Sequence, residues 1–111
     1  MIDSYAGHDT DDGKISQMRL HAGDAADLMK ALGNESRLMV LCALAEGERS
    51  VSELNEGIPL SQSALSQQLG RLRRENLVST RRESQTIYYS LVPGPVGKVI
   101  HLLHDIYCST T

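Results

Sequence analysis

The sequence contains no tryptophan and no phenylalanine, and its four aromatic residues are all tyrosine. Proteins that bind single-stranded nucleic acid stack bases on aromatic side chains, so that class is not expected. No apolar run approaches the roughly 20 residues that a membrane-spanning helix requires. The first 14 residues are polar and acidic and lack the apolar core of a secretion signal. We therefore expect a cytoplasmic protein without a membrane segment.

The motifs of enzymes are also missing. We find no glycine-rich phosphate loop, no paired acids suited to one pocket, and no nucleophile with an orienting triad. The sequence therefore predicts neither enzyme activity nor a bound cofactor. Its 111 residues suffice for one domain and are too few for two.

Net charge is low, at −3, but it is unevenly distributed. Residues 1–14 hold four aspartates against one lysine and account for all of it. Residues 61–82 hold five arginines against one glutamate. A basic segment inside a neutral domain is typical of a phosphate-binding surface, although a solvated helix face has a similar pattern. Arginine favours the first interpretation because it pairs bidentately with phosphate and with guanine.

The chain divides into an acidic tail, a folded domain and a short end. Residues 1–15 are predicted to be disordered, residues 16–108 to form the domain, and residues 109–111 a tail. Apolar spacing predicts a first helix from Ser16 to Leu32 and a second from Asn34 to Glu46, with Cys42 on its buried stripe. Gly33 and Gly47 are suited to end these helices.

The second half of the domain predicts two more helices, a hairpin and a last helix. Ser50 and Glu53 form a capping-box pattern that opens a short helix to Glu56. Ser61 can cap a helix from Gln62 to Glu75. Alternation predicts strands at 77–82 and 86–91, and a last helix with a wide apolar face follows Pro95. The fold class is mainly α with a small β-hairpin, a winged helix-turn-helix.

The helix at 62–75 would then be the recognition helix, whose first turns enter the major groove. Glutamine can bond adenine bidentately, and serine can bond base edges or phosphates. Arginines further along the helix and on the wing would contact the DNA backbone. The predicted DNA-binding residues are Gln62, Ser63, Ser66, Gln67, Arg71, Arg73, Arg74, Arg81 and Arg82. A protein-interaction module that has lost DNA binding is the alternative from another class.

Three separated segments resemble the ArsR/SmtB family of bacterial winged-helix repressors. They are Ala31-Leu32-Gly33-Asn34-Glu35-Ser36-Arg37-Leu38, the stretch from Leu60 to Leu69, and Thr86-Ile87-Tyr88-Tyr89-Ser90-Leu91. The resemblance covers residues 20–108. It implies a homodimer formed by the first and last helices, a palindromic double-stranded operator as partner, and an inducer that releases the DNA.

The family's metal-sensing branches offer one kind of inducer. Their Cys-x-Cys pattern is absent from Val51-Ser52-Glu53-Leu54-Asn55-Glu56. A zinc-sensing branch uses the last helix, where His101 and His104 stand here, but its leading Asp-x-His has no counterpart. We therefore expect first that the chain has no metal site. Zinc sensing through His101 and His104 remains the alternative.

The two cysteines are closer to another branch. One cysteine in the second helix and one at the end of the last helix resemble the persulfide- and redox-sensing BigR, SqrR and HlyU group. This resemblance implies that Cys42 and Cys108 are joined by a disulfide or polysulfide when reactive sulfur species or oxidants rise. Because desolvation should raise the pKa of Cys42, we expect Cys108 to attack first and Cys42 to resolve.

Overall fold

The computed structural model describes residues 9–108, with side chains from Gly13 onward. The chain divides into two compact units, which meet between Lys30 and Ala31. Within the described residues, no helix is long and apolar enough to cross a membrane.

The first unit is helical throughout its described part. Helix α1 spans Asp9–Leu32, so it begins inside the segment that we expected to be a disordered tail. The rest of the predicted tail, residues 1–8, lies outside the described residues, as do residues 109–111. Four large apolar side chains of α1 are exposed: Ile15, Met18, Leu20 and Met29.

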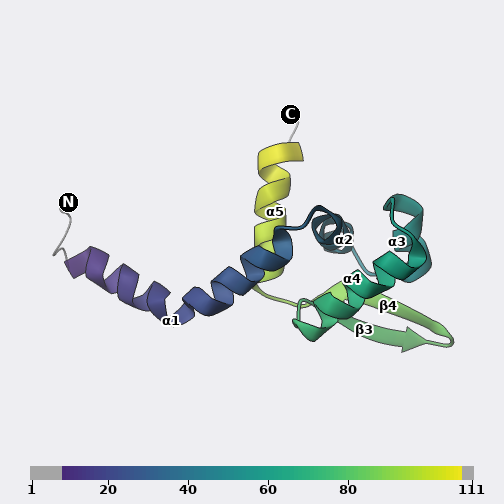
Figure 1. Cartoon of the computed structure of the whole chain (residues 1–111), viewed down its shortest axis with the longest axis horizontal. Coiled ribbons are helices and arrows are strands. Elements are labelled where there is room, and N and C mark those ends of the chain that lie inside the picture. Colours follow the sequence, from purple (N-terminus) through teal and green to yellow (C-terminus); the bar gives the residue numbers. More distant parts are fainter. Residues whose placement is uncertain (1–8, 109–111) are drawn as a thin grey trace. The chain divides into compact units, whose positions relative to one another are not determined.

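The first complete helix of the second unit is α2, Glu35–Ala45 (Figure 1). The Asn34 side chain accepts a hydrogen bond from the Arg37 amide at 3.0 Å, which confirms the expected cap. Gly47 follows the helix with a φ of +151°, a conformation that favours glycine. Val40, Leu41 and Leu44 form the buried stripe of α2, whereas Cys42 is only half-buried at its edge. The prediction that Cys42 lies on the buried stripe was wrong, because the core takes the neighbouring positions.

Helices α3, Val51–Gly57, and α4, Gln62–Arg74, form the helix-turn-helix. The capping box is present: Ser50 Oγ accepts from the Glu53 amide, and Glu53 Oε1 accepts from the Ser50 amide. On α4, Leu65, Leu69 and Leu72 are fully buried, as their spacing predicts. The helix closes with Asn76 at a φ of +61° and a bond from the Leu77 amide to the Leu72 carbonyl. This closure turns the chain directly into the wing.

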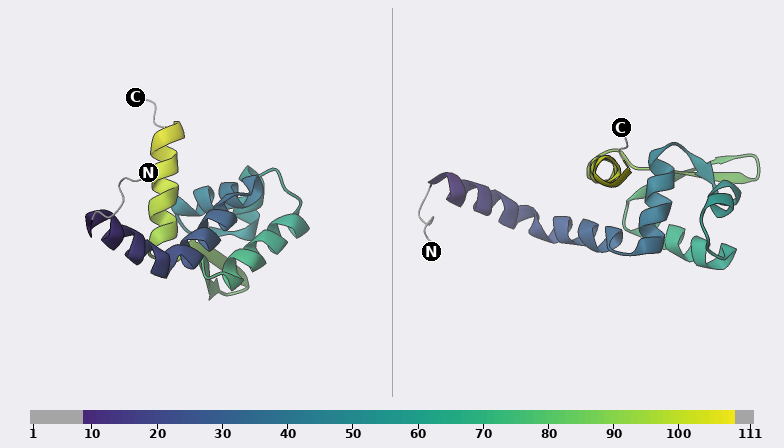
Figure 2. Two further views of the ribbon diagram at one scale, coloured as in Figure 1. Left: turned by 60° about the vertical axis from the view of Figure 1, so that its left-hand side comes forward. Right: turned by 90° about the horizontal axis from the view of Figure 1, so that it is seen from above.

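The sheet has three strands in the order β2-β4-β3. Strands β3, Val78–Glu83, and β4, Thr86–Leu91, form the predicted hairpin, joined at Ser84 and Gln85. Strand β2, Arg49–Ser50, was not predicted; it pairs antiparallel with β4 at Tyr88 and Tyr89. Figures 1 and 2 show the hairpin extending away from the helices of this unit. The predicted winged helix-turn-helix is therefore confirmed.

Helix α5, Pro95–Cys108, closes the second unit and packs against α2. Val96 and Ile100 are buried, whereas Leu102, Ile106 and Tyr107 further along are exposed. Figures 1 and 2 place α5 at the end of this unit away from the hairpin tip. The apolar face predicted for this helix thus has an inner part in the core of this unit and an outer part that is exposed among the described residues.

Candidate functional site

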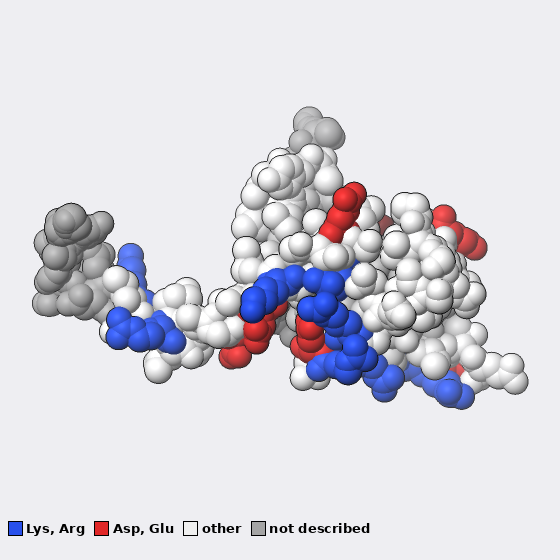
Figure 3. Space-filling view, viewed as in Figure 1, with Lys and Arg blue, Asp and Glu red and all other residues white. Residues whose placement is uncertain are grey.

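The outer face of α4 carries the predicted base-contacting residues. Since leucines occupy the inner face, the predicted polar residues all lie exposed on the other side: Gln62, Ser63, Ser66 and Gln67. Figure 3 shows Lys and Arg side chains gathered over α4 and the hairpin. This arrangement is a polar helix face flanked by cations, as major-groove recognition requires.

The arginines at the end of α4 differ in their surroundings. Arg71, Arg73 and Arg74 are all exposed. Arg71 Nε donates to Glu75 Oε2 at 3.0 Å, an exposed ion pair one helical turn apart. Such pairs exchange readily with a phosphate because water screens them. The three cations therefore remain placed as expected beside the polar face.

Arg81 of the wing is held more firmly than the sequence indicated. Its Nε and Nη2 donate to the two oxygens of Glu48 at 2.9 and 2.8 Å, and its Nη1 donates to Glu83 at 2.7 Å. The guanidinium also lies 4.8 Å from the centre of the Tyr88 ring. These bonds lower the pKa of the Glu48 carboxyl. Sequence reasoning missed Glu48, because 33 positions separate it from its partner. Arg82, the other predicted wing residue, is exposed.

We expect the substitution Glu48→Gln to strengthen DNA binding by about threefold to tenfold at low salt. The change removes one negative charge beside the wing and releases Arg81 from a bidentate pair toward phosphate. Gel shift at two salt concentrations measures the effect. Glu46→Gln is the matched control, since Glu46 pairs with Arg49 instead. Weaker DNA binding by Glu48→Gln would contradict this prediction and would mean that the Arg81–Glu48 pair positions the wing.

The two cysteines lie on helices that pack together. Both thiols are free, Cys42 half-buried on α2 and Cys108 exposed at the end of α5. A negative charge on Cys108 is close enough to raise the pKa of Cys42, which is an effect of short range. Thus two cysteines 66 positions apart in sequence lie on helices that contact each other.

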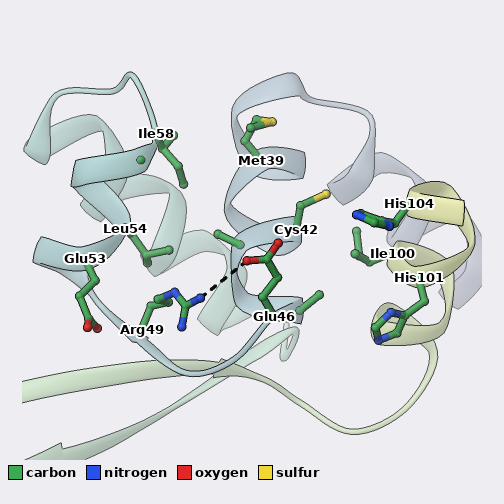
Figure 4. A pocket seen from close by; sticks show the side chains of 13 residues that line it. Met39, Cys42, Glu46, Arg49, Glu53, Leu54, Ile58, Ile100, His101 and His104 are labelled. Atoms are coloured by element: carbon green, nitrogen blue, oxygen red, sulfur yellow. Dashed lines mark ion pairs between the residues drawn. The ribbon is translucent and has the colours of Figure 1, made fainter. Parts of the chain in front are cut away.

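Cys42 faces a hollow of about 550 Å³ between α2, α3 and α5. In Figure 4 its sulfur points from α2 toward His104 on α5, and His101 lies nearby on the same helix. The walls are largely apolar, with Met39, Leu54 and Ile100 among them. Glu46 and Arg49 form an ion pair of 3.7 Å at this hollow. A small reagent therefore has room to approach the Cys42 thiol.

Burial is the main cause that raises the pKa of Cys42, followed by the charges of Cys108 and Glu46. Because the thiolate is the nucleophile, alkylation of Cys42 should increase about tenfold per pH unit. It should still be rising above pH 9.0, the ordinary pKa of this group. Iodoacetamide labelling followed by peptide mass spectrometry measures the profile. A plateau below that pH would contradict the assigned environment.

The histidines considered for zinc lie at the same helix interface. His101 and His104 both line the hollow. Among residues 9–108, no group of three or more His, Cys, Asp or Glu side chains is arranged to hold a metal ion. The zinc alternative stays a prediction from the sequence.

A helix-turn-helix with a polar, arginine-flanked second helix and a wing defines a winged-helix DNA-binding protein. Comparison with known proteins agrees. Residues 34–80 match the family model described as bacterial regulatory protein, arsR family. Transcriptional activator HlyU of Vibrio cholerae is 48% identical over 94 residues, covering 85% of this chain and 87% of that protein.

One further relative and a solved structure of HlyU extend this result. The biofilm growth-associated repressor of Xylella fastidiosa is 41% identical over 92 residues, covering 83% of this chain and 81% of the repressor. The solved structure of reduced HlyU from Vibrio cholerae superposes with a TM-score of 0.79 at 48% identity, covering 84% and 98% of the two chains. The chain therefore belongs to the ArsR family and is a DNA-binding transcriptional regulator rather than an enzyme.

Proposed function

We propose that the chain is a homodimeric repressor of a palindromic operator, released from DNA when Cys42 and Cys108 become linked. The inducer is a reactive sulfur species or a thiol oxidant, and the link is a disulfide or a short polysulfide. The observation that carries this proposal is that Cys42 on α2 lines the same hollow as His104 of the packed helix α5, one helical turn before Cys108.

The names of the relatives are compatible with repression and with a redox-dependent regulator. One similar protein is named a repressor and another an activator, so both modes occur among proteins like this one. The description of one solved relative as reduced HlyU states its redox state. A redox-dependent regulator is consistent with these names.

Operator binding would use the exposed face of α4 and the wing. Gln62, Ser63, Ser66 and Gln67 would contact base edges or nearby phosphates. Arg71, Arg73, Arg74 and Arg82 would contact phosphates, and Arg81 would do so only after leaving its carboxylate partners. A palindrome presents two half-sites, which two copies of the chain would match.

The homodimer is supported by apolar side chains that the single chain leaves exposed. On α5 these include Leu102, Ile106 and Tyr107. On α1, Ile15, Met18, Leu20 and Met29 are likewise exposed. Large exposed apolar surfaces are typical of protein interfaces, and a small domain gains stability from covering them. A second copy of the chain would cover both helices.

The chemistry of the link balances with an organic persulfide, RSSH, as oxidant. The Cys108 thiolate attacks the outer sulfur, the thiol RSH leaves, and Cys108 becomes a persulfide. The Cys42 thiolate then attacks Cys108 Sγ, the inner sulfur of this persulfide, so that the Sγ–S bond breaks and the outer sulfur leaves as hydrogen sulfide. Two thiols thus lose two electrons, which reduce RSSH to RSH and H₂S. If both cysteines first become persulfides, the same displacement gives a three-sulfur link.

The link would act through the contact between α2 and α5. It would tie the exposed end of α5 to the helix that precedes the helix-turn-helix. Recognition helices of a dimer must sit about one DNA turn apart, so a small shift at the dimer face weakens binding. A coupling of about 1–3 kcal/mol is enough for such a switch.

Mass spectrometry of protein treated with glutathione persulfide tests the link itself. We expect a Cys42–Cys108 crosslinked peptide, together with species heavier by the mass of one or more sulfur atoms. Cys42→Ser and Cys108→Ser should each abolish the crosslink. If treated wild-type protein shows no intramolecular link under conditions that modify both thiols, the proposed switch is wrong.

A further inference from the structure

A second hollow, of about 500 Å³, lies between α2 and the outer face of α4. Most of its lining is polar and comes from residues Ser66, Gln67, Gln68, Gly70, Arg71 and Arg74 of α4. The seventh lining residue is Arg37 of α2, which the sequence analysis did not count as a DNA-binding residue. The hollow therefore adjoins the proposed DNA surface and adds a new residue to it.

The charge of this hollow is of one sign. Three arginines line it and no acidic residue does, in contrast to the hollow at Cys42, which Glu46 and Glu53 line. Of these arginines, Arg71 pairs with Glu75 in an exposed contact. Convergent guanidinium groups bind phosphate through charge-assisted hydrogen bonds, so this chemistry favours a phosphate-type anion.

Arg37 is held in place rather than extended into solvent. Only 8% of it is exposed, and its Nε donates to the Ala31 carbonyl at 3.1 Å. A guanidinium fixed in this way loses little conformational freedom when an anion binds.

Gly70 is the least expected residue of the hollow. It lies within the 13-residue helix α4, where glycine is less stabilising than alanine. A Cβ at this position would meet Arg74 Nη1 at 3.5 Å, an ordinary contact. Packing within the chain therefore does not require glycine here. Close approach of a group from outside the protein would require it.

We propose that this hollow binds one phosphodiester group of the DNA backbone, held by Arg37 with Arg71 and Arg74 and admitted by Gly70. The inference rests on the proposed operator binding, and it adds a backbone contact to the base-contacting face. A phosphate carries no sequence information, so this contact would hold the recognition helix in register equally on any duplex.

The test measures affinity for an operator duplex and for an unrelated duplex at several salt concentrations. Arg37→Gln keeps a donor for the Ala31 carbonyl but removes the charge. It should weaken binding to both duplexes by the same factor and lower the slope of log affinity against log salt by about 1. Arg37→Lys should restore the slope. Lys98→Gln, which removes one exposed cation on α5, is the control and should leave the slope unchanged.

Gly70→Ala is an independent test, because it should change the thermal midpoint and the DNA affinity in opposite directions. The thermal midpoint should rise, since alanine favours the helix, while affinity for both duplexes falls about threefold to tenfold. If Arg37→Gln keeps the wild-type slope, or Gly70→Ala binds as the wild type does, the phosphate contact is refuted. If Arg37→Gln fails to fold, Gly70→Ala decides alone. Wild-type protein that binds neither duplex would instead contradict the proposed operator binding.

Discussion

Replacing Arg71 and Arg74 together by alanine should lower operator affinity about 30-fold to 300-fold at moderate salt. Both side chains are exposed at the end of α4, beside the polar face that we propose enters the major groove. Each substitution would remove one proposed phosphate contact and the counterion release that accompanies it. The slope of log affinity against log salt should therefore fall by about 2. Fluorescence anisotropy with a labelled operator duplex measures both quantities.

The double substitution should not affect folding, because neither arginine is part of the core. Lys98→Ala serves as a charge control on α5, with an expected affinity equal to that of the wild type. If the double variant binds its operator as tightly as the wild type does, the DNA surface is misplaced. The alternative of an interaction module without DNA binding would then gain weight.

Leu69→Ala should reduce the free energy of unfolding by about 2–5 kcal/mol. Leu69 is fully buried on the inner face of α4, between Leu65 and Leu72. Truncation leaves a cavity that the surrounding leucines fill only in part. In a domain this small, such a loss is a large fraction of the total stability. Urea denaturation followed by circular dichroism measures the change.

Gln62→Ala on the opposite face of the same helix provides the contrast. Gln62 is exposed in the first turn, so its removal should leave the unfolding midpoint nearly unchanged. Affinity for the operator should fall while affinity for an unrelated duplex stays the same, because a base contact carries sequence information. An unchanged stability for Leu69→Ala, or a large stability loss for Gln62→Ala, would mean that the buried and exposed faces of α4 are assigned wrongly.

Local patterns accounted for most of the fold. The capping box at Ser50 and Glu53 predicted the start of α3, and the leucine spacing at Leu65, Leu69 and Leu72 predicted the buried face of α4. These features involve residues within a few positions of one another, where propensity and periodicity are informative. The exposure of the polar residues on α4 follows from the same periodicity.

Features that depend on distant partners could not be predicted in the same way. Strand β2 has two residues and exists because Arg49 and Ser50 pair with β4. The bonds of Arg81 to Glu48, and the hollow that brings Arg37 beside α4, likewise join separate elements. The half-buried position of Cys42 depends on which side of α2 the core occupies. A single sequence carries no direct signal for such contacts.

The extent of α1 illustrates a different difficulty. The composition of residues 1–15 favours disorder, whereas the structure extends the helix back to Asp9. The compositional signal is an average over the whole segment and therefore does not show where a helix begins. Composition alone does not decide between the two.

The proposed function depends on a link between Cys42 and Cys108 that lowers operator affinity, and one titration tests this directly. Operator affinity is compared for the reduced protein and for purified protein carrying the link, with persulfide-treated Cys42→Ser and Cys108→Ser as controls. We expect the linked form to bind about 5-fold to 150-fold more weakly, and both serine variants to bind as the reduced protein does. Equal affinity of the linked and reduced forms would contradict the account.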